Sequence, residues 1–90
     1  MVASVEGNTI RVTHKNALYN CCLDDVEVEL VTRGTVLELI ETEILTYPCY
    51  CRCGYDVDSE IAPVGSGVYI LRVWNADRTE MFGEAEVVVE

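Results

Sequence analysis

The chain has 90 residues, half of them hydrophobic, and a formal net charge of −10 from 16 acidic and six basic residues. This length accommodates a single domain, residues 1–90, and no second one. The scarcity of basic residues argues against binding to nucleic acid or to anionic membranes. No apolar run approaches the roughly 18 residues of a membrane span. The acidity is typical of outward strand faces that keep a domain in solution.

The first part of the chain predicts one strand and a loop. We expect Met1–Asn8 to form either a flexible tail or a loosely held first strand. Alternating apolar residues in Thr9–His14 predict a strand with His14 on its apolar face. Lys15–Asn20 is then expected to be a loop that leads to the first cysteines.

A hairpin is predicted next. Val26–Leu30 alternates valine or leucine with glutamate, which is typical of a half-buried strand. Thr32–Gly34 is the turn, and Thr35–Ile44 is the returning strand. Because Val36–Ile40 is apolar on both faces, we expect this strand to be central in its sheet or to lie beside a bulge. Glutamates of this returning strand are expected at exposed or edge positions: Glu38, Glu41 and Glu43.

Three further strands complete the prediction, at Gly54–Ile61, Val68–Asn75 and Met81–Val89. The total is six or seven short strands with no helix. This pattern predicts an all-β fold, an antiparallel immunoglobulin-like β-sandwich.

Five cysteines lie in two clusters, an adjacent pair and a C-x-C-x-C run. In an extended run, Cys49, Cys51 and Cys53 point to one face, so bridges within the run are not expected. Adjacent Cys21 and Cys22 would point to opposite faces, so one of them is expected to face the run and the other to be left out.

Two interpretations make the clusters a cross-link, and a third does not. In one, disulfides join the pair to the run, and the odd number leaves at least one thiol over. In the other, thiolates and the single histidine hold Zn²⁺. The ligands would come from Cys21, Cys22, Cys49, Cys51, Cys53 and His14. Buried free cysteines that act as small apolar residues are a third reading.

Catalytic chemistry has little support in the sequence. A Cys–His dyad around His14 finds no third orienting group, and no phosphate loop or nucleophile elbow is present. His14 is expected instead to be a structural hydrogen-bonding residue beside the Cys21 loop. The carboxylates Asp56, Asp58 and Glu60 alternate as on any solvent-facing strand and match no calcium loop.

Two resemblances accompany these residues. Gly65–Val73 resembles the penultimate strand of many bacterial immunoglobulin-like modules. His14–Cys22, Glu41, Cys49–Asp56 and Gly67–Tyr69 together resemble a group of uncharacterised small domains in bacterial exported lipoproteins, with N-C-C and C-x-C-x-C elements. The second likeness spans about residues 10–75 and implies a sandwich fold and an extracytoplasmic setting, but no activity.

The expected function is therefore a non-enzymatic interaction or structural module, cross-linked through its cysteines and without a cofactor. Its partner would be an unknown protein or surface ligand. The N-terminal residues lack the features of a signal peptide. The chain is thus expected to be an extracytoplasmic domain trimmed of its export signal, with a cytoplasmic location as the other possibility. The alternative function is a zinc-type thiolate protein.

Overall fold

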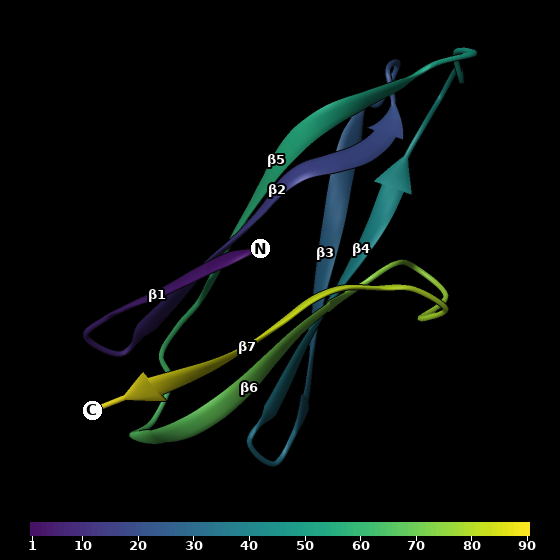
Figure 1. The fold of residues 1–90 in the computed structure, drawn as a ribbon. Helices are drawn as coiled ribbons and strands as arrows, with labels where there is room; N and C mark the ends of the chain where they lie inside the picture. The colour runs from purple at the N-terminus through teal and green to yellow at the C-terminus, as the bar shows by residue number, and fades with distance from the viewer.

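The computed structural model describes residues 1–90, and all its regular elements are strands (Figure 1). They are β1 (Val2–Glu6), β2 (Thr9–Asn20), β3 (Asp25–Arg33), β4 (Val36–Ile44), β5 (Arg52–Ile61), β6 (Gly67–Trp74) and β7 (Met81–Val89). They form a three-stranded sheet, β1-β2-β5, and a four-stranded sheet, β3-β4-β6-β7. The predicted all-β fold is confirmed, and no helix of the chain could cross a membrane.

One strand pair departs from the predicted antiparallel arrangement. β4 and β6 run parallel, with Val36 opposite Ile70 and Ile40 opposite Trp74, so the four-stranded sheet is mixed. The cause is topological. After β4 the chain crosses to the other sheet as β5 and crosses back, which lets β6 enter beside β4 in the same direction.

The N-terminal segment is a strand rather than a flexible tail. β1 pairs with β2 along its whole length. Met1, Ala3 and Val5 pack against the hydrophobic core. Gly7 makes the connecting turn at a φ of 60°, a left-handed conformation that glycine adopts without steric cost.

β2 continues through Lys15–Asn20, which we predicted to be a loop. Its register with β5 shifts between His14 and Ala17, and Asn16 has a left-handed φ of 55°. This bulge changes the side to which every later residue points. Ala17 and Tyr19 are therefore buried, although they are out of phase with the alternation that ends at His14.

The hairpin and the central strand follow the prediction. Gly34 turns the chain between β3 and β4 at a φ of 58°. β4 lies between β3 and β6. Both of its faces are covered along Leu37–Ile40, in agreement with the two-sided apolar pattern.

The hydrophobic core joins the two sheets in one half of an elongated molecule, 45 Å long and 23 by 17 Å across. Its buried members are Ile10, Val12, Leu37, Leu39, Ile61, Leu71, Val73, Val87 and Val89. The last residue of β4 paired with β6 is Ile40. Beyond it, β2 and β5 continue beside β3 and β4 alone (Figure 1). We call this end, which carries Ala17–Asp25 and Glu41–Val57, the cysteine half.

Replacing the fully buried Leu71 by alanine (Leu71→Ala) is expected to lower the free energy of unfolding by about 3 kcal/mol, because it removes apolar contacts and leaves a cavity. Urea unfolding followed by circular dichroism measures the change. The matched control Leu18→Ala, at a side chain 58% exposed, should change stability by less than about 0.5 kcal/mol. Equal losses for both variants would contradict the placement of the core.

Candidate functional site

Four of the five cysteines form disulfide bonds. Cys21 bonds to Cys53 and Cys22 bonds to Cys49, with Cα–Cα distances of 4.9 and 5.6 Å. Cys51 is free and exposed. The disulfide interpretation of the two clusters is confirmed, including the thiol left over by the odd number.

The cysteine left out is not the one expected. We expected Cys21 or Cys22 to point away, on the assumption that both lie in an extended strand. β2 ends at Asn20, and the pair lies in the turn that follows. Outside a strand, adjacent side chains are not forced to opposite faces, so both sulfurs reach the C-x-C-x-C run and only Cys51 stays unpaired.

The disulfides join the two connections that cross between the sheets at this end of the molecule. One connection runs from β2 to β3 and contains Cys21 and Cys22. The other runs from β4 to β5 and contains Cys49, while Cys53 lies at the start of β5. Their sequence separations of 32 and 27 residues correspond to about 3.5 kcal/mol for each bond taken alone in the chain-entropy model.

Asn20 ties the same two connections together through hydrogen bonds. Its Nδ2 donates to the Cys49 carbonyl at 2.7 Å, and its Oδ1 accepts from the backbone N–H groups of Cys22 and Cys49, both at 2.9 Å. The Tyr55 hydroxyl lies 3.1 Å from the Asn20 carbonyl and 3.2 Å from the Cys21 carbonyl. These bonds satisfy backbone groups that the turn would otherwise leave without partners.

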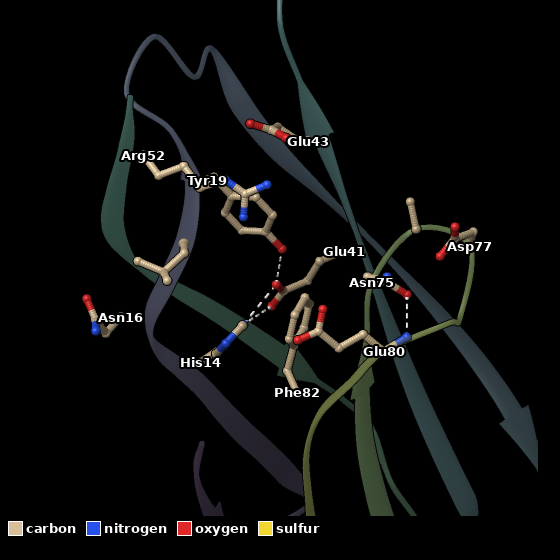
Figure 2. Close-up of a pocket in the computed structure, with 12 residues that line it drawn as sticks. His14, Asn16, Tyr19, Glu41, Glu43, Arg52, Asn75, Asp77, Glu80 and Phe82 are labelled. Carbon is tan, nitrogen blue, oxygen red and sulfur yellow. Dashed lines mark hydrogen bonds and ion pairs between the residues drawn. The ribbon is translucent and has the colours of Figure 1, made fainter. Parts of the chain in front are cut away.

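A buried carboxylate of one sheet accepts hydrogen bonds from side chains of the other sheet (Figure 2). Glu41 of β4 is only 3% exposed. Its Oε1 accepts the Tyr19 hydroxyl at 2.5 Å, and the His14 Nδ1 lies 2.9 and 3.0 Å from its two oxygens. Because Tyr19 and His14 belong to β2, this cluster joins the four-stranded sheet to the three-stranded one.

The glutamates of β4 do not lie where we expected them. Glu38 and Glu41 are 4% and 3% exposed, because their strand is central in its sheet and covered on both sides. Glu38 lies 3.4 Å from the Arg33 Nε and 3.8 Å from the Arg78 Nη1. Glu43 is half-buried and accepts the backbone N–H of Asn20 at 2.7 Å. The prediction of exposed or edge positions was wrong for Glu38 and Glu41.

His14 does not join the cysteines. Its imidazole stacks on Phe82, with ring centroids 4.7 Å apart and an interplanar angle of 28°, and it contacts Glu41. Nowhere in the chain are three or more His, Cys, Asp or Glu side chains arranged to hold a metal ion. The structure therefore does not bring Cys21, Cys22, Cys49, Cys51, Cys53 and His14 together as zinc ligands.

The Glu41 cluster forms one side of an open cleft of about 520 Å³ (Figure 2). The rest of the lining comes from β4, β5, the turn between β6 and β7, and the start of β7. It includes Glu43, Arg52, Asn75, Asp77, Glu80 and Phe82. Carboxylates outnumber the single guanidinium, and two aromatic rings face the same space. The excess of carboxylate oxygens makes the cleft a surface of hydrogen-bond acceptors.

The electrostatics of the cleft hold the phenol of Tyr19 in its protonated form. Burial, followed by the hydrogen bond and the negative charge of Glu41, raises the pKa of Tyr19 well above its ordinary range. At the mouth of the cleft, hydrogen bonds from Thr79 lower the pKa of the exposed Asp77. Tyr19 is thus a fixed donor, and Asp77 a fixed negative charge.

Sequence reasoning missed Tyr19 and Glu41 as members of the site. The signal for Glu41 was its place directly after the two-sided apolar run Leu37–Ile40, since a carboxylate that continues such a run is buried with its strand. Tyr19 had no comparable signal, because the bulge at Asn16 is needed to turn it inward.

Comparison with protein-family models, with curated proteins and with solved structures gives no match to the chain. Its function is therefore inferred from the residues and contacts described above.

The first prediction from this site concerns Glu41→Gln. The amide keeps the shape of the side chain but removes its negative charge and replaces one acceptor oxygen by an NH₂ donor. Its single oxygen cannot replace both carboxylate oxygens, so we expect a loss of about 2 kcal/mol in the free energy of unfolding. Urea unfolding at neutral pH measures it. Glu27→Gln, at an exposed position, is the control and should lie within about 0.5 kcal/mol of the wild type. An unchanged Glu41→Gln stability would show that the cluster does not hold the sheets together.

The second prediction concerns alkaline pH. Because the pKa of Tyr19 is raised in the folded chain, the unfolded chain loses this proton first, and stability should fall as pH rises above the ordinary tyrosine value of about 10. Tyr19→Phe removes this ionisation and should give a shallower fall. Urea unfolding at several pH values between about 9 and 11 measures the slope. Tyr50→Phe, at a fully exposed ring, should keep the wild-type slope. Identical slopes for all three proteins would refute the assignment.

Proposed function

We propose that this chain is a non-enzymatic, extracytoplasmic, immunoglobulin-like module that presents a binding or structural surface to another protein or to a surface ligand. The observation that carries the proposal is the pair of disulfides across the two sheet-to-sheet connections. They fix the cysteine half, which has almost no hydrophobic core of its own.

The disulfides support an extracytoplasmic setting. Disulfides persist in oxidising compartments, and small exported domains use them where the hydrophobic core is limited. Here the bonds lie at the end of the molecule opposite the core cluster, where a covalent link replaces missing apolar packing. The resemblance to domains of bacterial exported lipoproteins points in the same direction.

The division into three and four strands supports an immunoglobulin-like arrangement, since such domains pack two sheets over a shared core. The parallel pairing of β4 with β6 is a departure from that family, whose sheets are antiparallel. The chain is therefore proposed as a variant of the immunoglobulin plan rather than a standard member.

The contacts of His14 and Glu41 support a structural rather than a catalytic role. The His14 Nδ1 is taken by Glu41, its ring is stacked on Phe82, and the Glu41 carboxylate is buried between two donors. Glu41 orients the imidazole through Nδ1, as a third group would in a catalytic site, but a nucleophile would also have to lie within hydrogen-bond reach of the ring. The hydrogen bonds of His14 go to Glu41, and the ring makes none to a cysteine, serine or threonine. The side chains on this side of the neighbouring cleft are therefore held in place by hydrogen bonds and ring stacking.

Thiol counting tests this proposal. Protein purified without reductant, then denatured and alkylated, should gain one modification, at Cys51, and should gain five after reduction. Intact-mass spectrometry reads both states. The variant Cys51→Ser should gain none before reduction. Five alkylated thiols in unreduced protein, together with zinc in elemental analysis, would overturn the disulfide-linked module in favour of the zinc-type protein.

A further inference from the structure

The two sheets leave a groove open between their free edges. β3 is the outermost strand of the four-stranded sheet and β5 the outermost strand of the three-stranded sheet, so each has one edge without a neighbouring strand (Figure 1). A groove of about 340 Å³ lies between them. Val26 and Val28 line one wall, and Tyr55 and Val57 line the other. Unpaired backbone groups along such edges are a ready template for an additional strand.

The apolar residues in this groove point inward but are only half-buried. Val26, Val28, Tyr55 and Val57 occupy the inward positions of their strands, yet each keeps part of its surface in contact with water. Leu30, the next inward residue of β3, is 42% exposed. The inward residues Val87 and Val89 of the opposite edge strand, β7, are only 7% and 2% exposed. The groove therefore lacks the cover that an additional element would provide.

The charges beside the groove differ between the two edges. On β5, the outward carboxylates are already engaged by β2: Asp56 accepts the Asn16 N–H, Asp58 the Thr13 hydroxyl, and Glu60 pairs with Arg11. On β3, the outward Glu27 and Glu29 are exposed and form no ion pair. Their register partners on β4 are Thr42 and Ile40, which carry no positive charge.

This charge pattern favours a basic strand over an acidic one at the β3 edge. A strand added beside β3 would place alternate side chains within about 5 Å of Glu27 and Glu29, where opposite charges attract and like charges repel. A second copy of this chain, with a net charge of −10, would bring its own carboxylates to that row. A basic strand would neutralise the row and turn its intervening side chains toward Val26, Val28 and Val57.

We infer that the β3 edge binds an extended segment of a partner protein in which basic and apolar residues alternate, and that this segment adds to the four-stranded sheet as a strand. This inference rests on the proposed role of the chain as an interaction module, and it names the surface and the chemistry of the partner.

The test uses a synthetic peptide as long as β3, nine residues, in which lysine and valine alternate. A peptide of the same composition, with its lysines in one block and its valines in another, is the control for pattern. Titration into ¹⁵N-labelled protein should move the amide signals of β3 and of the Tyr55–Val57 wall with the alternating peptide. The block peptide should bind more weakly.

Charge reversal at the edge identifies the site. Glu27→Lys with Glu29→Lys should weaken binding at least about tenfold. The matched control, Glu86→Lys with Glu90→Lys, changes the net charge equally at exposed residues that form no ion pairs, and should have little effect. Thermal unfolding checks that both variants are folded. The neutral pair Glu27→Gln with Glu29→Gln should give an intermediate loss and serves if the reversed pair does not fold.

Three results would overturn the inference. Equal weakening by both charge-reversed pairs, with signals moving over the whole acidic surface, would show non-specific attraction. Movement confined to the His14–Tyr19–Glu41 cleft would place binding at the other surface. If the alternating peptide does not bind at millimolar concentration, the inference is wrong, and the charges of the β3 edge serve only to prevent aggregation. In each case, thiol counting still decides separately whether the disulfide-linked module itself stands.

Discussion

Two disulfides and one buried carboxylate hold together the half of this molecule that the hydrophobic core does not reach. The apolar cluster ends where β6 and β7 turn, and beyond that point β2 and β5 lie opposite β3 and β4. Between them lie polar side chains and apolar ones that are only half-buried. Glu41 accepts hydrogen bonds from two residues of β2, and Glu43 accepts one from the backbone of Asn20 at the end of the same strand. The disulfides join the connections that follow. A buried carboxylate without hydrogen-bond partners would lower the stability of the fold. Glu41 therefore needs the hydrogen bonds from Tyr19 and His14.

The open surfaces of the molecule follow from this construction. A core of large apolar side chains would draw the two sheets together and close the space between their edges. Here the hydrogen bonds to Glu41 and Glu43 and the two disulfides connect the sheets without filling the space between them. A cleft therefore remains on the side of the β6–β7 turn and a groove on the side of β3 and β5. Both surfaces are bordered by carboxylates, in keeping with the net charge of the chain.

Because of the bulge, β2 contributes side chains both to the hydrophobic core and to the hydrogen bonds with Glu41. Ile10 and Val12 face the core before it, and Ala17 and Tyr19 face the same interior after it, although strict alternation would turn them outward. Without the extra residue at Asn16, the phenol that Glu41 needs would point to solvent. One local irregularity thus decides whether the carboxylate of the neighbouring sheet is satisfied.

The sequence by itself determined most of the strands, because alternation and two-sided apolar runs depend only on neighbours along the chain. It did not determine Lys15–Asn20, where the bulge breaks the alternation and hides the second half of β2. It indicated that the two cysteine clusters could be joined, but it left disulfides, a zinc site and free thiols as alternatives, and the structure decided for two disulfides. Only the tertiary structure decided which thiol stays free, because that depends on Cys21 and Cys22 lying in a turn. It also decided the parallel entry of β6 beside β4, the burial of Glu38 and Glu41 in a central strand, and the inward turn of Tyr19. Each of these features depends on which distant strands pack together. The periodicity of residues along the chain contains no information about that packing.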